Sequence, residues 1–288
     1  MRWERDGADW PNREFSRFVD CRPHRWHVQR AGAGRKVLLV HGAGGATHSW
    51  RDVLPNLAAD HDVMALDLPG QGFTRLGARR RCGLDEMAAD IAALLTQEDF
   101  APDILVGHSA GAAIALRMAL SGATRPALAI GFNPALSNFP GLAGWLFPTM
   151  AKLLSLNPLT ALVFSRTATP GAVRRLIEGT GSRIDARGLD LYARLLRDYR
   201  HVDGALEMMA SWSLDRLLAD LPGLSTPVRF VVGAGDRAVS PDAAFTALGA
   251  LPDCQVTTWP GLGHLAHEEA PQMASEYVRN AKLEIDTR

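Results

Sequence analysis

The chain has 288 residues, of which 47% are hydrophobic and 22% are charged. These proportions are typical of a globular protein, and the length allows one large domain or two small ones. The 31 lysines and arginines balance the 31 aspartates and glutamates, so the formal net charge is zero. No global field then favours nucleic acid or an anionic membrane, and we predict no nucleic-acid partner.

Three cysteines, Cys21, Cys82 and Cys254, lie far apart in the sequence. An odd number of distant cysteines argues against a disulfide framework and favours a reducing compartment. None belongs to a Cys-X-X-Cys pair, and no cluster of histidines or carboxylates indicates a metal, so we expect neither a metal nor a cofactor. The first six residues carry charges of both signs with no apolar stretch behind them, which predicts no signal peptide and a cytoplasmic location.

Residues 141–164 form an apolar stretch in which Lys152 is the only charge. At ~20 residues such a stretch is long enough to cross a bilayer. Pro148, Asn157 and Pro158 interrupt it, however, and proline breaks a helix interior. We therefore predict short apolar helices and no transmembrane segment, an interpretation that leaves peripheral contact with a membrane open.

Hydrophobic periodicity predicts strands and helices that alternate along most of the chain. Residues 1–23 are expected to be irregular, and the alternation at 26–29 predicts an early edge strand. The expected elements then follow as a strand at 36–40, a helix from 47 or 49 to 57, a strand at 63–67, a helix at 84–95, a strand at 103–107, a helix at 109–120 and a strand at 126–132. Near the end of the chain we expect strands at 228–232 and 255–259 and helices at 241–251 and 270–283.

This alternation predicts an α/β fold with a mostly parallel sheet and helices on both faces. The alternation stops over residues 137–218, which are rich in Leu, Met and Arg and contain no strand-type run. We interpret 137–218 as a helical cap inserted into a core made of 1–136 and 219–288.

The motif Gly107-His108-Ser109-Ala110-Gly111 follows an apolar strand-type run and precedes a helix-forming run. Strand, tight turn and helix in this order are the context of a nucleophile elbow, in which Ser109 is exposed at the tip of a strand. Gly107 and Gly111 are expected where strand and helix pass too close for side chains. The alternative is an ordinary Gly/Ser turn of an α/β protein.

A serine nucleophile needs a base, and the base needs an acid that orients it. Asp236 follows the predicted strand at 228–232, and His264 follows the strand at 255–259, so both are expected at the same sheet edge as Ser109. Asp236 could instead be a simple turn residue. His267 is a rival base inside an acidic helix start, and the amide of Asn133 cannot serve as the acid.

The glycine-rich turn His41-Gly42-Ala43-Gly44-Gly45 follows the strand at 36–40. We predict an oxyanion hole made by the backbone N–H groups of Ala43 and Ala110. A phosphate-binding loop is the competing interpretation, but its Gly-Lys-Ser/Thr ending and the GxGxxG spacing are absent. His41 is expected to make structural hydrogen bonds, and His108 to point away from Ser109.

The cap contains more large apolar residues than packing requires, which indicates an apolar substrate pocket. Any single one of them could equally pack the cap onto the sheet domain. The predicted pocket residues are Trp145, Phe147, Met150, Met208 and Trp212.

Five motifs occur in the order found in the α/β-hydrolase superfamily, which the chain resembles over residues 25–285. They are His41–Gly45, Asp67–Gly72, Gly107–Gly111, Gly235–Asp236 and Gly263–His264. This resemblance implies the α/β-hydrolase fold with a helical cap.

A narrower resemblance, which extends into the cap, is to the magnesium-chelatase accessory hydrolases (BchO type) of phototrophic bacteria. It is carried by Trp26–Gln29, Ala46–Arg51, Gly107–Ala113, Phe139–Gly144 and Gly179–Arg183. It implies a role beside bacteriochlorophyll synthesis, with a tetrapyrrole as ligand and magnesium-chelatase subunits as partners.

Two functions of different classes follow. The first is a Ser-His-Asp hydrolase acting on an ester, or a related acyl or carbon–carbon bond, of a bulky apolar substrate. Epoxide hydrolases and dehalogenases of this fold use an aspartate nucleophile, so Ser109 counts against them. The second is a non-catalytic porphyrin-binding or chelatase accessory protein with an idle triad.

Overall fold

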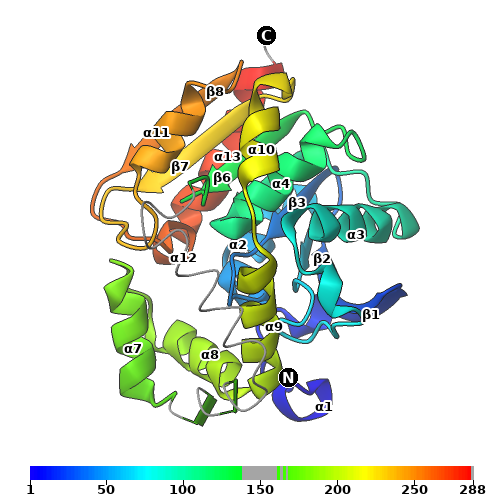
Figure 1. Ribbon diagram of the computed structural model, residues 1–288, viewed down its shortest axis with the longest axis vertical. Helices are drawn as coiled ribbons and strands as arrows, with labels where there is room; N and C mark the ends of the chain where they lie inside the picture. The colour runs from blue at the N-terminus through cyan, green and yellow to red at the C-terminus, as the bar shows by residue number, and fades with distance from the viewer. Residues whose placement is uncertain (138–160, 163–164, 167, 287–288) are drawn as a thin grey trace.

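One sheet of eight strands runs through the computed structural model, in the order β1-β2-β4-β3-β5-β6-β7-β8 (Figure 1). The structure describes residues 1–137, 161–162, 165–166 and 168–286. The strands are β1 Ser16–Cys21, β2 His24–Ala31, β3 Arg35–Val40, β4 His61–Leu66, β5 Ile104–His108, β6 Leu128–Phe132, β7 Val228–Gly233 and β8 Cys254–Trp259.

Strands β4, β3, β5, β6, β7 and β8 are parallel, whereas β1 and β2 are antiparallel to their neighbours. The carboxyl ends of the parallel strands therefore meet at one edge of the sheet. In open sheets of this kind, ligands bind in the crevice outside these ends.

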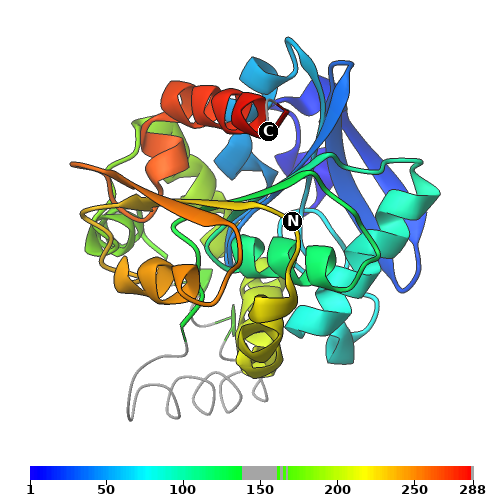
Figure 2. The same ribbon diagram turned by 90° about the horizontal axis from the view of Figure 1, so that it is seen from above.

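Helices cover both faces of the sheet, as Figure 2 shows. Helices α2 (Val53–Leu57) and α13 (Pro271–Asp286) pack on one face, and α3 (Leu84–Gln97), α4 (Ala110–Leu120) and α11 (Asp242–Leu248) pack on the other. Each face has its own hydrophobic core, because side chains alternate along a strand: Val37 and Leu39 enter one core, Leu38 and Val40 the other. The predicted α/β-hydrolase fold class is confirmed.

The predicted edge strand at 26–29 was wrong in its position within the sheet. Residues 24–31 form β2, which pairs with both β1 and β4, and the edge belongs to β1. Residues 16–21 had been expected to be irregular, because only Phe18 and Val19 are large apolar residues among polar neighbours. A strand at the edge of a sheet tolerates that composition, since much of its surface faces water.

The helix predicted from 47 or 49 to 57 is divided into a 3-10 helix, η2 (Thr47–Trp50), and α2. Pro55 explains the division, because proline has no N–H and its ring clashes with the carbonyl four residues earlier, here that of Arg51. Further short segments are α1 (Trp3–Asp6), α12 (Ala266–Glu269) and the 3-10 helices η1 (Arg13–Phe15), η3 (Arg79–Arg81) and η4 (Leu221–Gly223).

The described residues between β6 and β7 include several helices and no strand, as predicted. They form α7 (Pro170–Gly179), α8 (Ala186–Arg197), α9 (Tyr199–Ser211) and α10 (Asp215–Asp220), and α7 to α9 lie together beyond one end of the sheet (Figure 1). Helix α10 crosses the boundary expected at 218, and the division into core and cap stays a prediction.

None of the helices within the described ranges has the length and apolar run needed to cross a bilayer. The stretch 141–164 lies almost entirely outside those ranges.

Candidate active site

Ser109 follows β5 and is the N-cap residue of α4, with φ 52° and ψ −118°. A positive φ in a residue other than glycine stores strain and is typical of functional sites. The predicted close approach of strand and helix is confirmed, because a Cβ built at Gly107 would lie 2.3 Å from the carbonyl carbon of Gly111. A Cβ at Gly111 would lie 2.2 Å from the oxygen of Val40. The tight turn that an elbow requires is therefore present.

His264 and Asp236 come together at the carboxyl edge of β7 and β8. The Nδ1 of His264 lies 2.8 Å from Oδ2 of Asp236, and their side chains are 11% and 2% exposed. Such a contact holds the imidazole in one orientation and leaves Nε2 available. The rival base His267 is buried between Trp50 and His108, and its ring nitrogens have no hydrogen-bond partner in the described part of the chain.

The carboxylate of Asp236 accepts several further hydrogen bonds. Its Oδ2 accepts from Nδ2 of Asn133 at 2.8 Å, and its Oδ1 accepts from the N–H groups of Ala238 and Val239 at 2.8 and 2.9 Å. Burial favours the neutral acid, but His264 and these donors outweigh it and hold the pKa of Asp236 below its ordinary value. Sequence reasoning excluded Asn133 as an acid and missed this role as a donor to the acid.

His108 links the strand before Ser109 to the loop that carries His264. Its Nε2 donates to the backbone oxygen of His264 at 2.9 Å, and the two rings lie 4.8 Å apart. Burial lowers the pKa of His108 well below its ordinary value, so the ring is neutral and has one N–H to donate. Its Nε2 is engaged with this backbone oxygen, and the expectation that the ring points away from Ser109 stays a prediction.

The His41–Gly45 turn packs directly against Ser109. A Cβ built at Gly42 would lie 3.0 Å from Cβ of Ser109. The N–H groups of Ala43 and Ala110 have no acceptor among the described residues, and the oxyanion hole expected from them stays a prediction. His41 bonds to the oxygen of Gly42 and accepts from the N–H of Leu68, the structural role expected of it.

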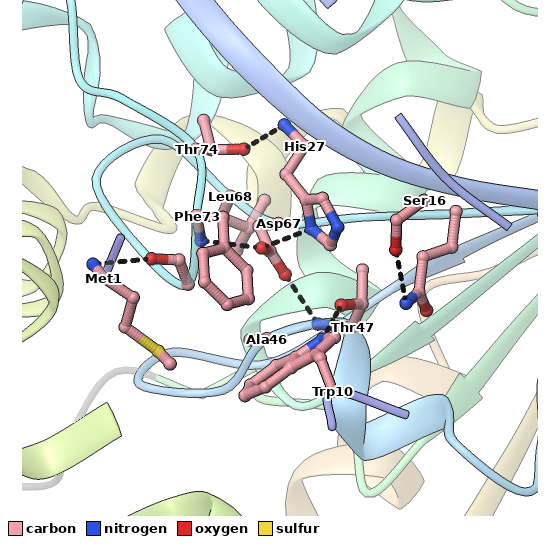
Figure 3. A network of polar contacts seen from close by, with 12 residues as sticks. Met1, Trp10, Ser16, His27, Ala46, Thr47, Asp67, Leu68, Phe73 and Thr74 are labelled. Carbon is pink, nitrogen blue, oxygen red and sulfur yellow. Dashed lines mark hydrogen bonds and ion pairs between the residues drawn. The ribbon is translucent and has the colours of Figure 1, made fainter. Parts of the chain in front are cut away.

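Asp67 anchors the segments next to this turn (Figure 3). Its carboxylate bonds to Nδ1 of His27 at 2.7 Å and accepts from the N–H groups of Thr47 and Phe73 at 2.7 and 2.8 Å. Burial would raise the pKa of Asp67, but the attraction of His27 and these donors lower it instead. Trp10 extends the network by donating to the Thr47 hydroxyl at 3.1 Å.

Gly44 of the turn is held by two residues that sequence reasoning missed. Its N–H donates to Oε1 of Gln71 at 2.7 Å, and its oxygen accepts from Nε2 of His201 at 3.1 Å. Gln71 stood in the Asp67–Gly72 motif, which was noted only for its resemblance to the α/β-hydrolase superfamily, and His201 lies on α9, where no pattern in a single sequence marks it.

The predicted pocket residues Trp145, Phe147 and Met150 lie outside the described residues. Met208 is buried and its Sδ accepts from Nε2 of Gln71 at 3.3 Å, while Trp212 is partly buried against the core shared with α3 and α4. Their place in a substrate pocket stays a prediction.

A model of the alpha/beta hydrolase family matches residues 37–276. The magnesium-chelatase 30 kDa subunit of Rhodobacter capsulatus is 41% identical over 91% of this chain and 93% of its own length. The dihydrolipoyllysine-residue acetyltransferase component of the acetoin cleaving system of Pseudomonas putida is 29% identical over 88% of this chain but only 65% of its own length.

Among solved structures, epoxide hydrolase CorEH without ligand has a TM-score of 0.77 at 20% identity, covering 91% of this chain and 96% of that one. A likeness at this identity concerns the fold alone. The matched family model and the similarity to the Rhodobacter protein show that the chain belongs to the alpha/beta hydrolase family.

Proposed function

We propose that the protein is a serine hydrolase that cleaves an ester, or a related acyl or carbon–carbon bond, of a bulky apolar substrate. The observation that carries the proposal is the 2.8 Å contact of His264 with Asp236 at the sheet edge where Ser109 begins α4. A carboxylate at Nδ1 keeps the proton on that nitrogen and leaves Nε2 as the base. The lowered pKa of Asp236 keeps this carboxylate ionised.

In the proposed mechanism, Nε2 of His264 takes the hydroxyl proton of Ser109 while Oγ bonds to the substrate carbonyl carbon. The carbonyl electrons move to its oxygen, which accepts from the N–H groups of Ala43 and Ala110. Each such donor typically lowers the barrier by ~3 kcal/mol. The oxyanion then collapses, the leaving group departs with the proton from His264, and water activated by the same histidine releases the acyl group from Ser109.

The biological setting that we propose follows from the Rhodobacter relative, whose name makes it part of magnesium chelatase. We place this protein beside bacteriochlorophyll and magnesium-porphyrin synthesis, with a tetrapyrrole as the apolar substrate and chelatase subunits as partners. Trp145, Phe147, Met150, Met208 and Trp212 are the proposed substrate contacts. We also propose a cytoplasmic location that permits peripheral membrane contact.

The name of the same relative favours a second candidate, a non-catalytic porphyrin-binding or chelatase accessory protein. In that case the Ser109, His264 and Asp236 constellation would be inherited and idle. The discriminating observation is whether Ser109→Ala still supports pigment formation.

Intact-mass labelling with a fluorophosphonate probe tests the two candidates, with Ser109→Ala and His264→Ala as controls. We expect one adduct on the wild-type protein and none on Ser109→Ala. His264→Ala should label at least ~10²-fold more slowly, because general-base catalysis is worth about that much. No labelling of wild-type protein with a native circular dichroism spectrum would contradict the hydrolase and favour the accessory protein.

A further inference from the structure

His201 of α9 joins two separate loops of the sheet domain. Its Nε2 donates to the oxygen of Gly44 at 3.1 Å, and its Nδ1 accepts from the N–H of Gly72 at 3.0 Å. The residue is 1% exposed. Both bonds need a neutral ring with its proton on Nε2, and burial lowers the pKa of His201 to about 4, which keeps the ring neutral.

Helix α9 also supports the second residue that holds Gly44. Gln71 accepts from the N–H of Gly44 through Oε1 and donates to Sδ of Met208 through Nε2. Met208 lies on α9, two helical turns after His201. Both polar groups of Gly44, which has a φ of +76°, are therefore fixed by contacts that begin on one helix.

The backbone of α9 packs closely against the 67–72 loop. A Cβ built at Gly204 would lie 2.3 Å from the oxygen of Gly70, so any side chain there would move the helix outward. The first turn of α9 is fixed as well, because the carboxylate of Asp198 accepts from the N–H groups of Arg200 and His201. Contacts therefore fix the backbone of α9 both before and after His201.

The geometry points to His201 as a positioning residue that, from α9, holds the His41–Gly45 turn, which supplies Ala43 to the proposed oxyanion hole. It acts through Gly44, the residue after Ala43. The orientation of the peptide bonds around Ala43 sets the direction of the Ala43 N–H. This inference rests on the proposed function only for its catalytic consequence, because the turn is held by His201 whether or not Ser109 is used.

A set of variants separates the two hydrogen bonds. His201→Gln places an amide N–H at about the reach of Nε2, His201→Asn places an amide oxygen at about the reach of Nδ1, and His201→Phe keeps the ring without either group. His24→Phe is the matched control, because His24 is also buried and accepts a backbone N–H, that of Gly77, away from the site.

Two measurements apply to each variant. The first is hydrogen exchange of the 41–45 segment followed by mass spectrometry, which needs no activity. We expect exchange to rise at least tenfold in His201→Phe and His201→Asn, and to stay within about threefold of wild type in His201→Gln and His24→Phe. The second is hydrolysis of p-nitrophenyl butyrate, for which kcat should fall ~10- to 100-fold in the same two variants while KM holds.

Unchanged exchange of the turn in His201→Phe would overturn the inference, whatever the activity. Equal acceleration in His24→Phe would also overturn it, because the effect would then reflect lost stability alone. If the turn opens as expected but wild-type protein neither hydrolyses the ester nor labels with fluorophosphonate, the positioning role stands and the hydrolase proposal falls.

Discussion

On the side of the site that carries Asp236 and His264, backbone packs against backbone, whereas on the side of the His41–Gly45 turn two side chains hold the chain. We call residues 233–237 and 261–264 the base side, and residues 41–45 the turn side. A Cβ built at Gly263 would lie 2.3 Å from the carbonyl carbon of Gly181, and one at Gly181 would lie 1.9 Å from the oxygen of Gly235. The base side thus includes the backbone of Gly181, between α7 and α8, in its packing, while both polar groups of Gly44 on the turn side are held by Gln71 and His201.

The two sides should therefore respond to different changes, namely added side chains on the base side and protonation on the turn side. Backbone packing through glycines does not respond to protonation, but it tolerates no side chain. A histidine that bridges two loops tolerates modest changes in shape, but it works in only one protonation state.

The largest effect is expected from Asp236→Asn on the base side. The amide keeps the shape but can donate to Nδ1 of His264, which would favour the wrong tautomer, and kcat should fall ~10⁴-fold. This equals roughly 5.5 kcal/mol of barrier. Steady-state kinetics would measure it, and a loss of less than tenfold would show that Asp236 does not orient the base.

The next largest effect is expected from Gly181→Ala, which should lower the free energy of unfolding. Its φ of +86° disfavours any side chain, and the new Cβ would meet the oxygen of Gly235. Strain and overpacking together should cost roughly 3–5 kcal/mol of unfolding free energy, measured by urea titration. Gly179→Ala is the matched control, because a Cβ there meets nothing within 4 Å. Equal stability of the two variants would contradict the interlocked backbone.

Lowering the pH should reduce the free energy of unfolding that His201 contributes on the turn side. Burial lowers the pKa of His201 to about 4, so between roughly pH 6.5 and pH 4 the unfolded chain binds a proton that the folded chain does not. The stability that depends on the neutral ring is complete above about pH 6.5 and is lost as the pH falls toward 4, by up to roughly 3 kcal/mol.

Urea titrations at pH 7.5, 6 and 5 would measure this loss. His48, His108 and His267 add to it, because burial lowers the pKa of each well below the ordinary value. His201→Phe should lose less stability over this range than wild type. An identical pH dependence in the two proteins would show that His201 does not contribute.

The smallest effect is expected from Arg79→Ala. Arg79 pairs with Asp203 and Glu207 on α9, but its side chain is 50% exposed. Exposed ion pairs are screened by water and salt, so we expect a loss below ~1 kcal/mol and unchanged turnover. A larger loss in thermal unfolding would mean that charges on the outside of α9, as well as His201, hold α9 in place.

The strands of the sheet could be predicted from residue spacing, because the apolar pattern of each strand lies within one short stretch of the sequence. Leu38 and Val40 face one core while Val37 and Leu39 face the other, and such a doubly buried strand reads as a continuous apolar run. The meeting of Asp236 with His264 could be predicted for a similar reason, since each follows a parallel strand and such strands end at one edge.

The supports of the site could not be predicted in this way. His201 and Gln71 are single polar residues whose partners are backbone groups of other segments, and no periodicity encodes such a pairing. The edge strand at 16–21 was missed because its exposed face removes the apolar pattern by which a strand is recognised. Asn133 was judged by its chemistry as an acid, whereas its value lies in donating to one.

The order of strands along the chain also sets when the proposed site can be completed. Ala43 and Ala110 follow β3 and β5, which are neighbours in the sheet, but Asp236 and His264 follow β7 and β8, the last two strands of the chain. A growing chain thus contains the proposed oxyanion donors and, once α9 is made, the residues that hold the His41–Gly45 turn, before it contains the proposed base His264. Recovery of turnover by the proposed hydrolase after dilution from denaturant would therefore report when β8 and the loop after it reach their places. Compact intermediates that lack them would show no turnover.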